Sequence, residues 1–177
     1  AMLGIAVAVG IVVGLLISIF LVAPLQVGCY RWYILNRTSN PPMGELLNSF
    51  RNGYFNTAKI MFCMGLYTTL WSLLFIIPGI IKAYEYSMIP YLLAENPNMS
   101  KKEAFAISKE LMDGNKFNAF VLDLSFILWN FVGALALGLP GVFFVNPYVQ
   151  LTNVELYVKL CQIRAERHNS TYNQDNN

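Results

Sequence analysis

Two apolar runs of this chain are too long to cross a membrane once, and a Pro-Gly pair interrupts each of them. The first extends from residue 57 to 95 and contains "IIPGII"; the second extends from residue 117 to 159 and contains "GLPGVF". As one helix, the first run would be about 58 Å long, roughly twice the hydrocarbon thickness of a bilayer. Because Pro-Gly is a strong turn signal, the pattern predicts turns at Pro78-Gly79 and Pro140-Gly141.

Composition points to a membrane protein. Hydrophobic residues make up 56% of the 177 residues and charged residues only 12%, whereas soluble domains carry about 25% charged residues. The net charge of +2, without a basic stripe, argues against nucleic-acid binding. The three cysteines are scattered in apolar segments, which predicts reduced thiols and neither a disulfide framework nor a metal site.

The predicted fold is all-α: a polytopic transmembrane helical bundle in one domain, residues 1–168, followed by a disordered polar tail, residues 169–177. Five spans are expected here, and six if a helix precedes them. The predicted spans are 3–24, 57–77, 80–95, 117–138 and 141–160, and the predicted interfacial helices are 43–52 and 100–113. Since the segment 80–95 is short for a span, a re-entrant segment is the alternative there.

The two hairpins resemble one another. Gly53 ends the first short helix and Gly114 the second, and a similar spacing separates them from Pro78 and Pro140. Each half then continues with an apolar stretch and a Pro-Tyr pair. This pattern predicts an internal repeat of interfacial helix, span, turn and span, as membrane transport folds often contain.

The basic residues predict the orientation. If the Pro-Gly turns face outward, all Lys and Arg except Lys82 lie on the opposite side. Basic residues are in excess on the cytoplasmic side of membrane proteins. We therefore expect the C-terminus and both interfacial helices to be cytoplasmic.

The segment 100–113 reads as an amphipathic helix at the membrane surface. Ser100 and Glu103 form a capping box at its start. Lys101, Lys102 and Lys109 lie on its polar face, where they are candidates for contact with lipid headgroups. A solvated connecting helix is the alternative.

Long stretches of the sequence also resemble a known family. "IIPGIIKAYEYSMIPYLLAENPNMSKKEAFAISKELMDGNK", followed by "FNAFVLDLSFILW", is similar to bacterial integral membrane proteins grouped as domain of unknown function 975 (DUF975). The resemblance covers nearly the whole chain, although family members usually begin with a further helix with a Gly-Asn-Trp start. It implies a six-helix bundle in a bacterial plasma membrane, and it implies no activity.

Charged residues inside apolar helices are the first candidates for a functional site. Lys82 and Glu85 are three residues apart, so they can pair on one helix face. Asp123 lies two turns into the span that begins near residue 117, where a carboxylate needs a donor such as Ser, Tyr or Lys from another helix. These residues either form part of a polar cavity or are structural ion pairs.

A polar stripe on the last span is the second candidate. Asn146, Gln150 and Asn153 recur at spacings of four and three residues, which places them on one helix face. Such a stripe either joins helices or lines a cavity. With Lys82, Glu85 and Asp123 it would complete a polar cavity inside the bundle.

No catalytic motif accompanies these residues. The single histidine, His168, lies in the polar C-terminal region, and no hydrolase, metalloprotease or phosphate-binding motif occurs. We expect a non-enzymatic protein with no cofactor and no metal. It would handle or transport a small molecule, lipid or peptide, for instance as an accessory of an export or envelope system. The alternative is a scaffold that binds anionic lipid or a cytoplasmic partner. Expected partners are membrane lipids and a membrane protein or a second copy.

Overall fold

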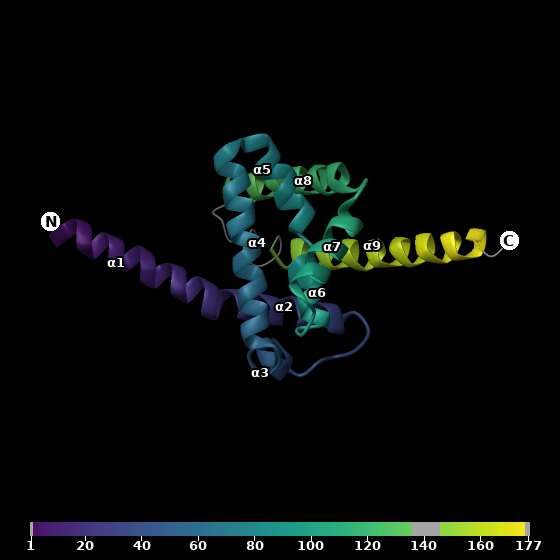
Figure 1. Ribbon diagram of the computed structural model, residues 1–177, viewed down its shortest axis with the longest axis horizontal. Coiled ribbons are helices and arrows are strands. Elements are labelled where there is room, and N and C mark those ends of the chain that lie inside the picture. The colour runs from purple at the N-terminus through teal and green to yellow at the C-terminus, as the bar shows by residue number, and fades with distance from the viewer. Residues whose placement is uncertain (1, 136–145, 176–177) are drawn as a thin grey trace.

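The computed structural model describes residues 2–135 and 146–175, and every element in them is helical (Figure 1). The all-α prediction is confirmed for this part of the chain. The elements are α1 (Met2–Ile17), the π-helical turn η1 (Ser18–Val22), α2 (Ala23–Asn36), the 3₁₀ turn η2 (Met43–Leu47), α3 (Asn48–Arg51), α4 (Tyr54–Leu74), α5 (Ile76–Tyr86), α6 (Ile89–Glu95), α7 (Lys101–Met112), α8 (Lys116–Leu135) and α9 (Asn146–Asp175).

The first predicted span continues without a break through η1 into α2. The wider π turn ends at Val22, two residues before Pro24. A π turn shifts the local hydrogen-bond pattern and so accommodates a residue without an N–H, which lets the chain remain helical past the proline. Within the described residues, one helix is long and apolar enough to cross a membrane, Val9–Asn36, and only 6% of its most apolar window is buried. A signal sequence near an N-terminus passes the same test, so this helix alone does not establish several spans.

The helices do not lie side by side in one direction. In Figure 1, α1 extends away from the other helices and α4 lies across the direction of α1 and α2. The transmembrane bundle of several spans therefore stays a prediction.

The predicted turn at Pro78-Gly79 is wrong by three residues. The chain turns at Phe75, whose backbone is extended, and Pro78 lies in the first turn of α5. A proline in the first turn removes no helical hydrogen bond, because those N–H groups have no intrahelical acceptor. Gly79 instead permits close packing of α5 on α4: a Cβ there would lie 2.5 Å from Cα of Ser72.

The predicted span 80–95 is not a single helix, since the chain forms two helices there. The break falls at Ser87 and Met88, and Pro90 lies in the first turn of α6. The 11 residues of α5 give a length of about 16 Å, roughly half the hydrocarbon core of a bilayer. Neither α5 nor α6 is long enough to cross a membrane alone.

The short helix α6 lies at the centre of the core. Its residues from Ile89 to Ala94 are all buried, and α2, α4, α7 and α9 surround it. Arg31 of α2 donates a hydrogen bond to the carbonyl oxygen of Ala94 (2.9 Å) and pairs with Glu45 of η2 (2.7 Å). Burial of each large apolar side chain here stabilises the fold by about 1.5–3 kcal/mol.

Of the two predicted surface helices, one forms as expected. In α7, the Ser100 hydroxyl accepts a hydrogen bond from the N–H of Glu103 (3.2 Å), and Gly114 follows the helix with φ +74°. The predicted helix 43–52 is instead the 3₁₀ turn η2 followed by the single turn α3. This segment packs directly on α2, where a Cβ on Gly28 would lie 1.9 Å from the carbonyl oxygen of Leu46.

The second half of the chain agrees in part with the predicted boundaries. Helix α8 begins at Lys116, but the predicted turn at Pro140-Gly141 lies outside the described residues, so the repeat stays a prediction. Disorder was expected from residue 169, whereas α9 is helical to Asp175. No Gly or Pro follows Pro147, so no residue in this region strongly opposes the continuing helix.

Candidate functional site

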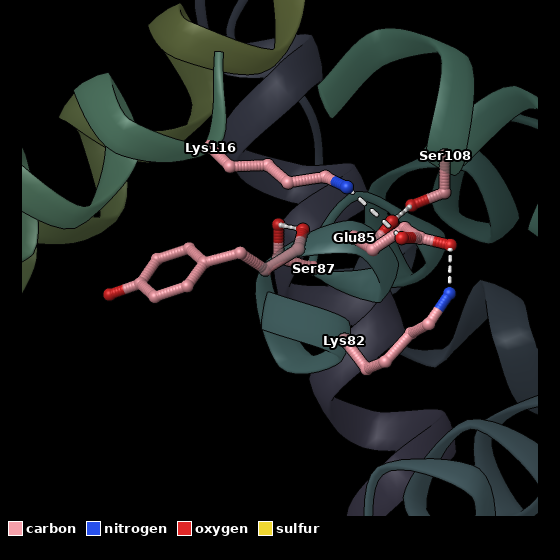
Figure 2. A network of polar contacts seen from close by, with 6 residues as sticks. Lys82, Glu85, Ser87, Ser108 and Lys116 are labelled. Atoms are coloured by element: carbon pink, nitrogen blue, oxygen red, sulfur yellow. Dashed lines mark hydrogen bonds and ion pairs between the residues drawn. The ribbon is translucent and has the colours of Figure 1, made fainter. Parts of the chain in front are cut away.

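Glu85 is held between two lysines. Its Oε1 lies 2.8 Å from Nζ of Lys82, one turn earlier on α5, and its Oε2 lies 3.0 Å from Nζ of Lys116 at the start of α8. Figure 2 shows the carboxylate between the two ammonium groups. The Ser108 hydroxyl of α7 donates a hydrogen bond to the backbone oxygen of Glu85 (2.8 Å). The predicted pairing of Lys82 with Glu85 is therefore confirmed.

We call Lys82, Glu85 and Lys116 the Glu85 cluster. Glu85 is only 4% exposed, and a carboxylate at such a site needs opposite charge and hydrogen bonds. Both of its oxygens have a lysine, and Lys82 also lies 5.7 Å from the ring centres of Trp71 and Tyr86. The cluster joins α5 to α8, and Ser108 adds a contact from α7 to the same residue.

Asp123 lies in a different environment. It lines a pocket of about 200 Å³ between α2, α5, α6, α8 and α9. We call this the Asp123 pocket; the residues that define it are Tyr30, Tyr84, Ser87, Tyr91, Asp123 and Asn153. Oδ2 of Asp123 accepts a hydrogen bond from the Tyr84 hydroxyl (2.8 Å). The expected donor from another helix is thus a tyrosine of α5.

The aromatic side of the pocket is well supported. The ring centres of Tyr30 and Tyr91 are 4.3 Å apart, and Tyr91 stacks on Tyr157 at 5.4 Å. Tyr157 donates a hydrogen bond to Glu95 (2.5 Å). Stacked rings with a fixed neighbour keep a pocket wall in place.

The structure divides the predicted polar cavity. Asp123 and Asn153 meet in the Asp123 pocket, whereas Lys82 and Glu85 are not among its lining residues. Tyr84 and Glu85 are consecutive on α5, and consecutive helical residues point about 100° apart. One helix therefore presents a tyrosine to the pocket and a carboxylate to the Glu85 cluster.

Gln150 of the predicted stripe is not among the lining residues of this pocket. Oε1 of Gln150 is buried and accepts no hydrogen bond from the described residues. The side chain of Asn146 lies outside what the structure describes. Sequence reasoning missed Lys116 and the three tyrosines of the pocket, because tyrosines near helix ends are also typical of membrane interfaces.

The three lysines of α7 differ in their surroundings. Lys101 donates a hydrogen bond to the Tyr67 hydroxyl of α4 (2.9 Å) and lies 4.9 Å from the centre of that ring. Lys102 and Lys109 are exposed. Of the three lysines predicted to contact lipid, Lys102 and Lys109 therefore remain free to do so in the described part of the chain.

Away from the Glu85 cluster, another ionic contact joins α7 to α9. Glu110 lies 2.9 Å from Arg164 and 2.8 Å from His168. Burial opposes ionisation of Glu110, but hydrogen bonds from His168 and Arg164 prevail and lower the pKa of its carboxyl group. The contact fixes the C-terminal half of α9 beside α7.

In residues 2–135 and 146–175, no group of three or more His, Cys, Asp and Glu side chains is arranged to hold a metal ion.

Comparison with known proteins gives a family and no activity. No curated protein and no solved structure matches the chain. The model of a family described as "Protein of unknown function (DUF975)" matches residues 2–164, and the chain therefore belongs to the DUF975 family.

Proposed function

We propose that this chain is a non-catalytic bacterial membrane protein that binds a small ligand in the Asp123 pocket. The observation that carries the proposal is the convergence of five helices on one pocket with a carboxylate, an amide and three tyrosines. Small-molecule sites combine an apolar or aromatic lining with a few polar groups that fix the ligand's orientation. The Glu85 cluster would support this pocket from the other side of α5.

Membrane insertion is supported by exposed apolar side chains. Beyond the Val9–Asn36 helix, the tip between α4 and α5 exposes consecutive large residues from Leu73 to Ile77, each at least 66% accessible. A contiguous apolar surface of this kind is typical of a membrane or protein contact. The proposal includes a multi-pass chain in the plasma membrane with α7 and the C-terminus in the cytoplasm.

Native mass spectrometry of the purified full chain tests ligand binding. We expect a reproducible adduct that survives release from detergent micelles and from nanodiscs. Asp123→Asn should remove the adduct, whereas the matched control Asp113→Asn, at an exposed carboxylate after α7, should retain it. A bare mass in all three proteins would contradict ligand binding.

Cysteine accessibility tests the topology. In a background without the native cysteines, Lys102→Cys should react with a membrane-impermeant maleimide only after the cells are opened. Phe75→Cys, at the α4–α5 tip, should stay protected by lipid or react from outside. Labelling of both positions in intact cells would contradict the proposed orientation.

A scaffold function is the second candidate, and the exposure of Lys102 and Lys109 favours it. Basic residues near a membrane surface attract anionic lipid by about 1 kcal/mol each. The double substitution of both lysines by Glu should weaken binding to phosphatidylglycerol vesicles, while Lys101→Met should disturb the contact with Tyr67 instead. Unchanged vesicle binding in the double variant would contradict the scaffold function.

A further inference from the structure

The carboxylate of Asp123 has no cationic partner in the part of the chain that the structure describes. Its recorded partner is the neutral hydroxyl of Tyr84. The lysines of α5 and α8, Lys82 and Lys116, both pair with Glu85 instead. A partly buried carboxylate that no lysine or arginine balances favours a ligand that brings a positive charge.

The rest of the pocket suits the same kind of ligand. Tyr30, Tyr84 and Tyr91 line it together with Asp123. Aromatic rings attract cations through their negative faces, and rings grouped in a pocket are how proteins recognise quaternary ammonium groups. An anion would be repelled by Asp123, and a purely apolar ligand would leave the charge of that carboxylate unbalanced.

We propose that the Asp123 pocket binds a small organic cation, an amine or a quaternary ammonium compound, which rests on the proposed ligand-binding function. Asp123 supplies the opposite charge, and the rings of Tyr30 and Tyr84 contact the cationic head. Tyr91, stacked between Tyr30 and Tyr157, supports the wall behind them, and Asn153 and Ser87 offer hydrogen bonds to a polar substituent. The volume of about 200 Å³ is below the range of about 300–1,000 Å³ typical of sites for drug-sized ligands. The cation is therefore small, or only the head of a longer molecule enters.

Calorimetric titration of the full chain in maltoside micelles tests this proposal, because such micelles contain no ammonium lipid. Three cations serve as probes: choline, tetramethylammonium and ethanolamine. The uncharged control is 3,3-dimethylbutan-1-ol, which has the shape of choline with carbon in place of nitrogen. We expect at least one cation to bind at least tenfold more tightly than the uncharged control.

Variants locate the binding and separate charge from folding. Asp123→Asn should weaken cation binding at least tenfold and leave binding of the uncharged control unchanged. Asp113→Asn should change neither affinity. Tyr30→Phe keeps the aromatic ring and should retain cation binding. Tyr30→Leu removes the ring and should weaken cation binding. An unchanged melting temperature in Tyr30→Phe and Asp123→Asn shows that the fold is retained.

The outcomes separate this proposal from the one on which it rests. If 3,3-dimethylbutan-1-ol binds as tightly as the tightest of the three cations, or if Asp123→Asn leaves cation binding unchanged, the cation proposal is overturned. If no cation binds while native mass spectrometry shows an Asp123-dependent adduct of another class, the cation proposal fails and ligand binding stands. If neither a probe nor an adduct binds, both proposals fail.

Discussion

The Glu85 cluster and the Asp123 pocket lie on two sides of the same helix, and they treat a carboxylate in opposite ways. Glu85 is 4% exposed and has a lysine on each oxygen. Asp123 is half-buried and accepts a hydrogen bond from the Tyr84 hydroxyl. A carboxylate with its charge balanced inside the chain fastens helices, whereas one left unbalanced beside a pocket is available to a ligand.

Removing the charge of Glu85 should have the largest effect on stability. Glu85→Gln leaves two ammonium groups beside a neutral amide, and we expect a loss of about 2–3 kcal/mol, since both lysines retain some water contact. Thermal unfolding in detergent measures it, with the exposed Glu166→Gln as the matched control. Equal melting temperatures of the two variants would show that the Glu85 cluster does not stabilise the fold.

Displacing α5 should affect both regions together. In Gly79→Ala the new Cβ would meet the backbone of Ser72 at 2.5 Å, so α5 has to shift, and we expect a loss of about 1–3 kcal/mol. Because α5 carries Tyr84 and Glu85, ligand binding should weaken as well. Loss of stability with intact ligand binding would show that the pocket does not depend on the position of α5.

Asp123→Asn should reverse the pattern seen with Glu85. An amide oxygen still accepts the Tyr84 hydrogen bond, so we expect a stability loss of no more than about 1 kcal/mol. Ligand binding should be lost, as the titration and mass spectrometry measure. A loss of stability as large as that of Glu85→Gln would place Asp123 with the structural carboxylates and remove the contrast.

The smallest effect is expected at Glu110, a carboxylate at the surface. Its pairing with Arg164 and His168 should contribute no more than about 1 kcal/mol. Because these contacts lower the pKa of the folded protein's Glu110, the stabilisation is present above the ordinary pKa of about 4.3 and is lost as the pH falls below it.

Denaturation of the wild type and Glu110→Gln at a series of pH values measures this contribution. The two stability curves should differ at pH 5, where His168 and Arg164 are both charged, and converge toward pH 3. A difference that grows from pH 5 to pH 3 would have the wrong sign for a carboxylate whose pKa is lowered on folding.

Several local features could be predicted because they depend on neighbouring residues alone. The capping box of Ser100, the helix end at Gly114 and the pairing of Lys82 with Glu85 each involve residues within one or two turns. The break near Pro78 was expected at the right place in the chain but not at the right residue. Proline has the same sequence signature in a turn and in the first turn of a helix.

The contents of the site could be predicted only in part. Asp123 and Asn153 were recognised as polar residues in apolar helices, but the separation of Asp123 from Glu85 was not. That separation depends on the rotation of α5 between α8 and the core, and a single-residue step around a helix changes the side that a residue faces.

The sequence by itself determined the helical character of the described chain and its strongly apolar composition, because local signals and residue content suffice for these. Its resemblance along residues 2–164 determined the family. Only the tertiary structure decided that Lys116 completes the Glu85 cluster and that Tyr30, Tyr84 and Tyr91 surround Asp123. Contacts between segments far apart in the chain depend on helix rotation and crossing, which packing of the whole core fixes.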